Sequence, residues 1–474
     1  MLLPRAFQAE LINEARIAIR GGARRVLLQS ATGSGKTVIA SIIMQGMIER
    51  GTLPWFMVHR RELLTQTAAT LELAGIRPGF IARGNQYDSS KPAQLVGIQY
   101  AVRRLELLER PGAMIVDEAH HAVARDHTAL MDHWPDMLTL GLSATPERLD
   151  GRGLGDRFDV LLKGPSVRWL IDNNFLSDFR YFAPGKPDLS GVASVAGDYN
   201  QSQLEDVMGQ AALIGDVVRH YRELAADQPG IVFAVTRAHS RMIAKAFQAH
   251  GIDAAHIDGS MNDRERNAIV EAFRAGLLKV LVNVDLFGEG FDVPGIVYCG
   301  LCRPTKSLSM WMQQCGRALR IFDGKEHAII CDHAGNTFHH GLPDDERHWS
   351  LAAKSKSKRT GATDAIAVHQ CPLCYQVTAS QRRVCPCGYV FTIRERSIAW
   401  EDGELFELRP DELRRNEVVD KAMLRKAEQR ACQTFDELYD LAIRRGYGSP
   451  QAWAKTQLLM RKGKRPGGQR WRAR

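Results

Sequence analysis

A glycine-rich heptapeptide places the strongest constraint on the fold of this 474-residue chain. The segment ATGSGKT at residues 31–37 follows an apolar run at 26–28 and precedes a helical pattern at 37–47. Glycines between a buried strand and a helix let backbone N–H groups converge on phosphate oxygens. Lys36 can then reach the β- and γ-phosphates of a nucleotide, and the Thr37 hydroxyl can coordinate Mg²⁺. The sequence therefore predicts a phosphate-binding loop made by Thr32, Gly33, Ser34, Gly35, Lys36 and Thr37.

Apolar runs of strand length recur in two blocks of the chain. They lie at 26–28, 55–58, 94–98, 113–116 and 138–142, and again at 231–235, 253–256, 280–284, 296–301 and 328–331. Helical patterns separate the runs, and this alternation predicts parallel sheets covered on both faces. Ligands of such sheets bind at the carboxyl ends of the strands, where the polar loops of this chain fall. We therefore expect an α/β protein with two lobes of similar size.

A pair of acidic residues, Asp117 and Glu118, follows the apolar run at 113–116. Two adjacent carboxylates at the end of a strand can divide the work of hydrolysis. Asp117 can hold Mg²⁺, whereas Glu118 can orient and deprotonate the attacking water. Together with the phosphate-binding loop, the pair predicts an ATPase centre.

Four motifs occur in a characteristic order: ATGSGKT at 31–37, DEAH at 117–120, SAT at 143–145 and QQCGRALR at 313–320. In this respect the chain resembles the superfamily-two helicases. It is most similar to DEAH-type motors of the branch that contains RadD, XPB and the ResIII-like motors of restriction enzymes. The resemblance covers about residues 1–340. It implies two RecA-like lobes and an ATPase that nucleic acid stimulates.

The resemblance also implies roles for single residues of the nucleotide site. Arg5 and Gln8 match an adenine-sensing element, and the amide of Gln8 can read the donor and acceptor edge of adenine. Arg317 and Arg320 match arginines that face the γ-phosphate from the second lobe and neutralise charge in the transition state. Gly290 and Asp292 match a motif that approaches the nucleotide. The residues expected to couple hydrolysis to lobe movement are His120, Ser143, Ala144, Thr145 and Gln313.

Contacts with nucleic acid are expected on both lobes. The resemblance places Arg60 and Gln99 in backbone-contact motifs of the first lobe. In the second lobe it places Thr236, Arg237, Gly259 and Ser260 where relatives contact phosphates. Contacts of this kind give affinity and carry no sequence information.

Nine cysteines in a chain of this length do not form the framework of a small disulfide-stabilised protein. Four of them, in the pattern C-x-x-C and C-x-C, fall within seventeen positions: Cys371, Cys374, Cys385 and Cys387. Four thiolates at this spacing can close a tetrahedral, structural Zn²⁺ site. The shorter second turn leaves His369 as an alternative ligand. Cys299 and Cys302 lie on an expected strand, with side chains on opposite faces, so shared metal binding is not expected there.

These patterns divide the chain into six expected segments. They are an N-terminal RecA-like ATP-binding lobe at 1–165, a connector at 166–205, a C-terminal RecA-like helicase lobe at 206–340, a linker at 341–368, a zinc-ribbon-like module at 369–392, and a charged helical region with a basic tail at 393–474. The formal charge is +9, and residues 461–474 hold seven basic residues and no acid. A basic tail favours a polyanionic partner, although it can also be a solvated tail without a dedicated partner.

The expected function is that of a Mg²⁺-ATP-dependent nucleic-acid motor, a DNA helicase or translocase in DNA repair, recombination or replication. Three alternatives stay open: a duplex translocase that does not separate strands, an RNA helicase, and a recruitment factor in which ATP acts as a switch. No run of about 18 apolar residues and no secretory signal occurs, so no membrane association is expected. The chain is expected to be cytoplasmic and encoded by a bacterium or a phage.

Overall fold

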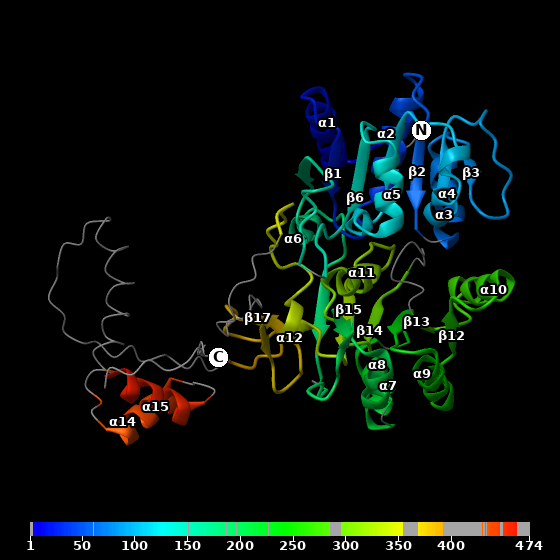
Figure 1. Ribbon diagram of the computed structural model, residues 1–474. Helices are drawn as coiled ribbons and strands as arrows, with labels where there is room; N and C mark the ends of the chain where they lie inside the picture. The colour runs from blue at the N-terminus through cyan, green and yellow to red at the C-terminus, as the bar shows by residue number, and fades with distance from the viewer. Residues whose placement is uncertain are drawn as a thin grey trace. The chain divides into compact units, whose positions relative to one another are not determined.

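The structure is a computed structural model, and the described part of the chain forms two compact units, Met1–Ile393 and Arg394–Arg474. The described residues are 3–59, 61–149, 151–184, 187–195, 197–209, 211–225, 227–284, 295–353, 368–391, 429, 432, 434–445 and 449–461. The first unit contains two sheets of parallel strands, which confirms the expected α/β fold with two lobes (Figure 1).

The first lobe is built on a seven-stranded parallel sheet in the order β3-β4-β2-β5-β6-β1-β7. Its strands are β1 (Arg25–Gln29), β2 (Pro54–Val58), β3 (Gly79–Ile81), β4 (Gln94–Gly97), β5 (Ala113–Val116), β6 (Thr139–Ser143) and β7 (Val160–Lys163). Its helices are α1 (Ala6–Arg20), α2 (Lys36–Ile48), α3 (Arg61–Leu73), α4 (Ile98–Val102) and α5 (Arg125–His133), with short 3₁₀ turns η1 (Leu105–Leu107) and η2 (Ala119–His121).

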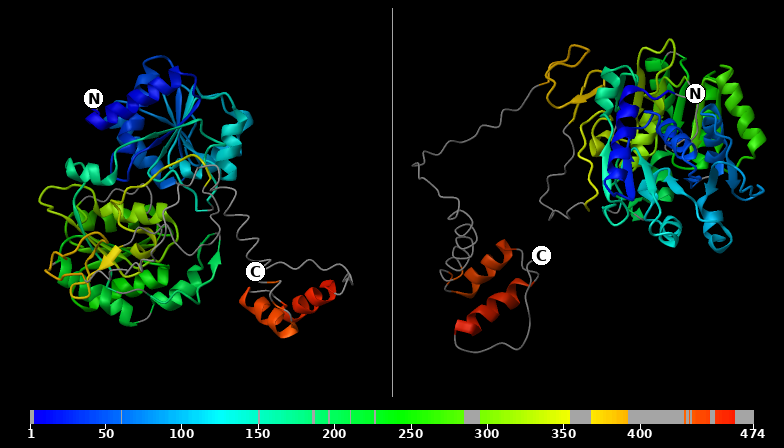
Figure 2. Two further views of the ribbon diagram at one scale, coloured as in Figure 1. Left: turned by 90° about the vertical axis from the view of Figure 1, so that its left-hand side faces the viewer. Right: turned by 90° about the horizontal axis from the view of Figure 1, so that it is seen from above.

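Helices cover both faces of this first sheet. Alternate residues of each strand point to opposite sides, so each strand contributes to an apolar cluster on both faces. Phe56 and Val58 of β2 pack with residues of α1, α2 and α3 in one apolar cluster. Trp55 and Met57 pack with residues of α4 and α5 in another. Figure 2 (left) shows the dark-blue helices on one side of the sheet and the cyan helices on the other.

The second lobe holds a six-stranded parallel sheet in the order β12-β13-β11-β14-β15-β8. Its strands are β8 (Phe179–Phe182), β11 (Gly230–Phe233), β12 (Ala254–Asp258), β13 (Val280–Val284), β14 (Tyr298–Leu301) and β15 (Ala328–Asp332). Its helices are α8 (Ala211–Ala225), α9 (Arg237–Ala249), α10 (Asp263–Arg274), α11 (Leu308–Ala318) and α12 (Thr337–His340). Helices α8 and α9 pack on one face, and α10 and α11 pack on the other.

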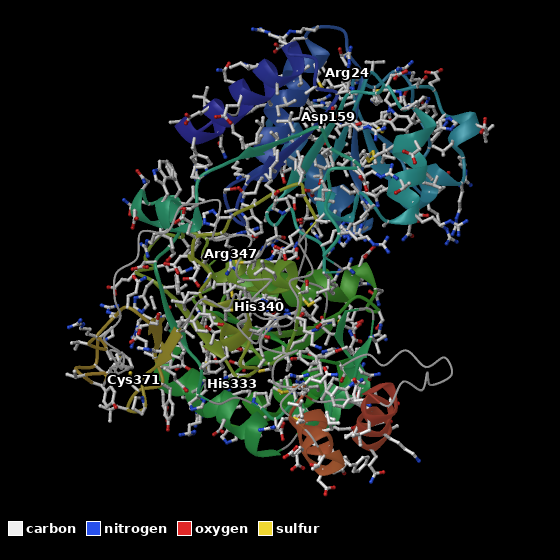
Figure 3. All side chains as sticks on the ribbon, turned by 60° about the vertical axis from the view of Figure 1, so that its left-hand side comes forward. Arg24, Asp159, His333, His340, Arg347 and Cys371 are labelled. Atoms are coloured by element: carbon white, nitrogen blue, oxygen red, sulfur yellow. The ribbon has the colours of Figure 1, made fainter. Side chains whose placement is uncertain are left out.

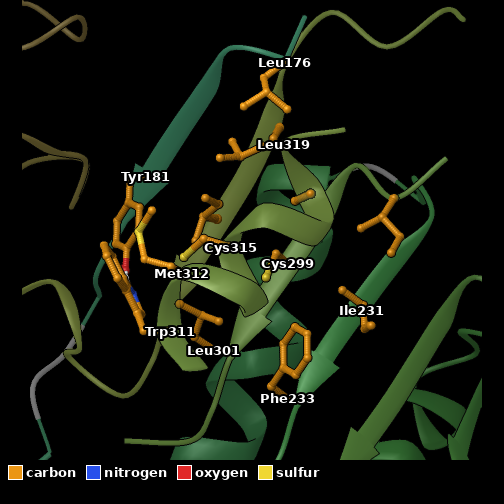
Figure 4. Packing of buried hydrophobic residues seen from close by; sticks show 14 of the residues in the cluster. Leu176, Tyr181, Ile231, Phe233, Cys299, Leu301, Trp311, Met312, Cys315 and Leu319 are labelled. Atoms are coloured by element: carbon orange, nitrogen blue, oxygen red, sulfur yellow. Dashed lines mark hydrogen bonds between the residues drawn. The ribbon is translucent and has the colours of Figure 1, made fainter. Parts of the chain in front are cut away.

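The two cysteines at 299 and 302 lie in different apolar clusters of the second lobe. Cys299 lies beneath α11, close to Leu301 and Cys315 of the same apolar cluster, as Figure 4 shows. Cys302, just after β14, packs with Tyr221 and Phe247 on the other face of the sheet. Opposite faces of one sheet therefore separate these side chains, as the strand pattern predicts.

The segment expected as a connector at 166–205 supplies a strand that the sequence analysis did not predict. This strand, β8, pairs in parallel with β15 and forms an edge of the second sheet. The other elements of the segment are α6 (Val167–Asp172), β9 (Ser194–Val195), β10 (Asp198–Tyr199) and the start of α7 (Gln201–Met208). Strands β9 and β10 pair as a short antiparallel hairpin.

The cysteine-rich module docks on the same edge of the second sheet. Its strands β16 (Val368–Gln370) and β17 (Val377–Ala379) pair antiparallel. A bridge joins Phe182 of β8 to Gln376, and the backbone N–H of Ala183 donates to the carbonyl of Tyr375 at 3.2 Å. The module thus continues the hydrogen-bonding edge that β8 presents.

The second unit contains two described helices, α14 (Phe435–Arg444) and α15 (Pro450–Arg461). They pack through Leu438, Leu441 and Trp453. Thr434 begins α14 with a capping box, since its hydroxyl accepts from the N–H of Glu437 and the Glu437 carboxylate accepts from the N–H of Thr434. Residues 462–474, which make up nearly all of the expected basic tail, lie outside the described residues. Among the described helices, none has both the length and the apolar character that crossing a membrane requires.

Candidate active site

The glycine-rich loop lies between β1 and α2, at the carboxyl end of its strand. Gly33 and Gly35 adopt φ values of +85° and +89°, which side chains other than glycine rarely adopt. Ser34 is buried and its hydroxyl donates to the carbonyl of Ala31 at 2.6 Å. Helix α2 begins at Lys36, so its amino end points its free N–H groups toward the loop. This is the arrangement that binds phosphate oxygens.

Gln8 of α1 fastens the first helix to this loop. Its Oε1 accepts from the N–H of Arg5 at 2.9 Å, and its Nε2 donates to the carbonyl of Ser34 at 2.8 Å. A methyl group added at Gly35 would lie 2.7 Å from Nε2 and would push the amide aside, and the φ of +89° independently favours glycine there. A primary amide has two hydrogens and two acceptor lone pairs, so one of each is left after these two bonds. The Arg5 guanidinium lies 5.1 Å from the centre of the Phe175 ring.

The two acidic residues lie beside the lysine of the loop. Lys36 Nζ is 3.7 Å from Glu118 Oε1, and Asp117 Oδ1 accepts from the N–H of Glu118 at 3.0 Å. Burial, together with the negative charge of Glu118, raises the pKa of Asp117 to about 6, although Lys36 opposes the shift. Two carboxylates, of which that of Glu118 is buried, lie beside one ammonium and leave an excess of negative charge. A divalent cation would balance it, so the residues present fit Mg²⁺.

His120 connects three parts of the site. Its Nδ1 lies 3.3 Å from Glu118 Oε2 and 3.4 Å from the hydroxyl of Ser143, at the end of β6. Its Nε2 lies 3.4 Å from the hydroxyl of Ser309, in the first turn of α11 in the second lobe. The sequence analysis missed Ser309, because no motif marks it. A cavity of about 380 Å³ borders this contact and is lined by residues of both lobes, Lys306 among them.

Helix α11 brings the second lobe against the phosphate loop. A methyl group added at Gly316 would lie 2.6 Å from Thr32 Cβ, so only glycine permits this approach. A methyl group added at Gly33 would lie 3.6 Å from Cγ of Arg320, so the stem of this arginine reaches the loop. Arg317 is also buried, and burial lowers the pKa of Arg320.

Several buried polar atoms of the motif residues have no hydrogen-bond partner among the described residues. They are Thr32 Oγ1, Thr145 Oγ1 and Gln313 Nε2. Buried polar atoms in native proteins nearly always have a hydrogen-bond partner, so atoms without one mark a place where a polar ligand fits. Ala144, between Ser143 and Thr145, is buried as well.

Lys325 is a second residue that the sequence analysis missed. Its ammonium donates to the carbonyl of Arg320 at 2.9 Å and contacts the carbonyl of Ala318, so it caps the end of α11. Burial lowers its pKa to about 8. The carbonyls of a helix end attract a positive charge, and this lysine therefore helps to fix the helix that carries the arginines.

Gln99, one of the two nucleic-acid candidates of the first lobe, lines a cavity of about 520 Å³ together with His59, Arg83 and Arg103. Arg104 also lines it, and its guanidinium lies 4.0 Å from the centre of the Tyr100 ring. The cavity thus combines positive charge with an aromatic face. Arg60 lies outside the described residues.

The candidates of the second lobe gather around Asp258, at the end of β12. The Thr236 hydroxyl accepts from the N–H of His239 at 3.1 Å and begins α9. Arg237 Nε lies 3.6 Å from Asp258 Oδ2, and Asp258 Oδ1 accepts from the N–H of Ser260 at 2.6 Å. Gly259 lies between these two residues, and a methyl group added there would meet nothing within 4 Å. Gly290 and Asp292 fall in 285–294, outside the described residues.

The four cysteines of the module form one cluster. Cys371 Sγ and Cys387 Sγ are 3.6 Å apart, and so are Cys374 Sγ and Cys385 Sγ. Sulfurs bound about 2.3 Å from a tetrahedral Zn²⁺ would be roughly 3.8 Å apart, so the cluster fits zinc. Within the described part of the chain, His369 is not one of the grouped ligands. Its ring contacts Phe391 instead, with 5.1 Å between ring centres.

A second group of ligand-type side chains, His220, Cys331 and His333, lies buried inside the second lobe, with ligand atoms within 4.8 Å of one another. Cys331 Sγ is 3.2 Å from His333 Nε2, the separation of a thiol–imidazole hydrogen bond. The rings of His220 and His333 stack with 5.3 Å between their centres. Packing and hydrogen bonding account for this group without a metal.

Comparisons with known proteins agree with this geometry. A family model described as the res subunit of type III restriction enzymes matches residues 1–148, and a helicase conserved C-terminal domain matches 212–322. A 51.5 kDa protein of a Lactococcus phage is 35% identical over 371 residues, which cover 78% of this chain and 79% of that protein. The yeast protein named "Putative ATP-dependent helicase IRC3" (Saccharomyces cerevisiae) is 30% identical over 353 residues. That match covers 70% of this chain and 51% of the yeast protein, so the chain spans about half the length of that relative.

Among solved structures, the fold is similar to a fragment described as a "putative HsdR subunit of a type I restriction enzyme from Vibrio vulnificus". The TM-score is 0.58 at 20% identity, over 73% of this chain and 67% of that one. The two lobes, the matching family models and the helicase relatives together define an ATP-dependent motor enzyme of the helicase class. Within that class, the chain belongs to the superfamily-two helicases, in the ResIII-like branch.

Proposed function

We propose that this protein is a Mg²⁺-ATP-dependent motor that moves on DNA, as a helicase or translocase in DNA repair, recombination or replication. One observation carries the proposal: Gly316 and Arg320 of the second lobe lie against Thr32 and Gly33 of the phosphate loop. A nucleotide held by Lys36 would therefore meet groups of both lobes. Hydrolysis would remove contacts that join the lobes, and this is how a two-lobed enzyme converts ATP into movement.

The residues of the site divide the chemistry among them. Lys36 binds the β- and γ-phosphates, and Thr37 and Asp117 would hold Mg²⁺, which neutralises phosphate charge. Glu118 orients the attacking water and accepts its proton. Arg317 and Arg320 stabilise the charge of the transition state, an effect on the order of 10³–10⁵ in rate for arginines in such positions.

Coupling is assigned to the contacts of His120. This side chain lies beside Glu118, Ser143 and Ser309, so it joins the hydrolytic carboxylate to the end of β6 and to α11. Gln313, Ala144 and Thr145 are also buried; Gln313 lies on α11, as Ser309 does, and Ala144 and Thr145 directly follow Ser143. A change at the γ-phosphate would thus reach both lobes through short polar contacts.

DNA is the proposed track because the matching family and the similar structure come from restriction enzymes, a class of enzymes that act on DNA. The positive formal charge of +9 suits any nucleic acid. An RNA track and duplex translocation without strand separation are the runner-up proposals. A recruitment factor with an ATP switch is disfavoured, because the groups that hydrolysis needs, Lys36 and Glu118, lie close together.

We also propose a structural Zn²⁺ bound by Cys371, Cys374, Cys385 and Cys387. The support is the 3.6 Å separation of the sulfurs in two pairs, Cys371 with Cys387 and Cys374 with Cys385. Four sulfur ligands leave no open position for catalysis, so the metal would only hold the module together.

The decisive experiment compares the ATPase rate of the purified protein alone and with single-stranded DNA, duplex DNA or RNA. We expect the strongest stimulation with DNA. A displacement assay on tailed duplexes then separates strand separation from translocation. Stimulation by RNA alone would exclude the DNA proposal, and a rate that no polymer changes would exclude a nucleic-acid motor.

A further inference from the structure

Residues 342–353, called the strap here, run between the two lobes. The strap follows α12 in the second lobe, and its first residue, Leu342, is buried in an apolar cluster of that lobe. Its far end reaches the first lobe, where Leu351 packs against a cluster that includes Leu154 and Phe158. The sequence analysis treated this segment only as part of a linker at 341–368.

Arg347 holds the strap to the helix that carries the arginines. Its guanidinium donates to the carbonyls of His340 and Leu342 at 3.0 and 3.1 Å. The guanidinium carbon lies 5.6 Å from the centre of the Trp311 ring, on α11, and His340 also stacks on that ring. Figure 3 labels Arg347 and His340. Trp311 is fully buried and donates to Tyr181 at 3.3 Å, so this end rests on a rigid part of the lobe.

The other end of the strap is fixed by backbone hydrogen bonds to the loop between β6 and β7. The carbonyl of Leu351 accepts from the N–H groups of Leu154 and Gly155 at 2.9 and 3.0 Å. A methyl group added at Gly153 would collide with that carbonyl and would lie 2.5 Å from the N–H nitrogen of Ala353. This loop follows Ser143, the last residue of β6, and begins with Ala144 and Thr145. Strand β6 neighbours β5, which ends just before the acidic pair.

We propose that the strap is a coupling element between the lobes, and that Arg347 is its positioning residue. The strap sets the distance between the lobes, and this distance decides whether α11 meets the phosphate loop. The inference rests on the proposed function, since it requires that Arg317 and Arg320 act on a nucleotide at Lys36. The strap contacts α11 at one end and the loop after Thr145 at the other. A change in the distance between the lobes must therefore loosen one end. The strap should affect the step that needs both lobes more than the binding of ATP to the first lobe.

The test uses the full chain and one variant at each end of the strap. Gly153→Ala disturbs the first-lobe end, and Arg347→Gln disturbs the second-lobe end. Each should lower the kcat of the DNA-stimulated ATPase roughly 2- to 30-fold, while the KM for ATP changes by less than about twofold. Because both act on one element, the double variant should be about as slow as the slower single variant. Arg347→Lys should be faster than Arg347→Gln but slower than the wild type, since lysine keeps the positive charge but lacks the planar donor group.

Matched controls are Gly191→Ala, where an added methyl group meets nothing within 4 Å, and Glu346→Gln, an exposed residue of the strap. Both should behave as wild type. A kcat that neither end changes, or two effects that simply multiply in the double variant, would overturn the proposal.

A second measurement does not depend on turnover. Hydrogen exchange at the Leu154 and Gly155 amides should be slow in the wild type and faster in Gly153→Ala, and equal exchange would also refute the strap. A wild-type ATPase that no nucleic acid stimulates would count against the proposed function. The exchange measurement would still decide whether the strap is attached.

Discussion

At the scale of single residues, the backbone of Glu118 adopts an unfavourable conformation that places its carboxylate in the site. Its backbone has φ 45° and ψ 54°, in the left-handed region. A residue with a side chain held there costs roughly 1 kcal/mol or more, and such conformations cluster at functional sites. The turn aims the carboxylate at Lys36, 3.7 Å away, and at His120. This placement is what general-base work on a water beside the γ-phosphate requires.

Glu118→Gln should therefore stop turnover without stopping ATP binding. The amide keeps the size of the side chain but cannot accept a proton, so we expect kcat to fall by about 10²–10⁴. Binding of a fluorescent ATP analogue should stay close to that of the wild type. Lys36→Ala should lose both binding and turnover, because it removes the positive charge at the phosphates.

The exposed Glu106→Gln is the matched control for that experiment, because it makes the same chemical change away from the site. Residual turnover of Glu118→Gln near the wild-type rate would show that another group is the base.

At the scale of elements, the cysteine module depends on more than its two strands. β16 and β17 have three residues each, and a two-stranded hairpin of that size is marginal in water. The proposed Zn²⁺, bound by Cys371, Cys374, Cys385 and Cys387, would supply the missing constraint, and the bridge between Phe182 and Gln376 ties the module to β8. Loss of this ion should then also expose the edge of the second sheet.

Cys371→Ser should reduce bound zinc, measured by elemental analysis, from about one ion per chain to none, because structural sites need four ligands. Proteases should then cut within 368–391 faster than in the wild type, since metal binding and folding are linked. The basal ATPase should stay nearly unchanged, because none of the hydrolytic residues lies in the module. Cys432→Ser, outside the cluster, is the control. A full zinc content in Cys371→Ser would show that the cysteines do not hold the metal.

The sequence predicted the strands that carry motifs but not all elements around them. β1 and β5 were found because each is a buried apolar run that ends in a polar motif, and the chemistry of Lys36 and Asp117 marks the ends. β8 has only four residues, and its pairing partner β15 lies about 150 residues later, so no local pattern marks it. The strap was missed for a related reason. Its contacts are mostly backbone carbonyls and a single arginine, neither of which has a sequence signature.

At the scale of the whole molecule, both lobes bury histidines that stay neutral. Burial lowers the pKa of His127 in the first lobe and of His333 in the second to about 3. It lowers the pKa of His239 and His340 to about 4. In the unfolded chain these rings would titrate near 6.5. The unfolded state therefore binds more protons than the folded state below that pH, and acid should destabilise both lobes.

The sign can be worked out for each group. A histidine with a lowered pKa gives stability that is present above about pH 6.5 and is lost as the pH falls toward the folded pKa. Asp117 and Asp332 act in the opposite direction, because burial raises the pKa of each to about 6, and their contribution is present at low pH and lost as the pH rises. Four buried histidines outweigh these two carboxylates between pH 6 and 4, so we expect the net stability to fall over that interval.

His127 gives the sharpest test, because its ring is 5% exposed and its Nε2 has no hydrogen-bond partner among the described residues. The imidazole of His127 would gain a proton when the chain unfolds. In His127→Gln its place is taken by an amide, which does not titrate. Each pH unit below 6.5 costs the wild type up to about 1.4 kcal/mol at this one position. Between pH 6 and 4, the free energy of unfolding of His127→Gln should therefore fall by about 2–2.5 kcal/mol less than that of the wild type. Urea denaturation at a series of pH values measures this difference, and His348→Gln, an exposed histidine of the strap, should leave the wild-type pH dependence unchanged. Parallel curves for His127→Gln and the wild type would mean that the ring is protonated in the folded protein.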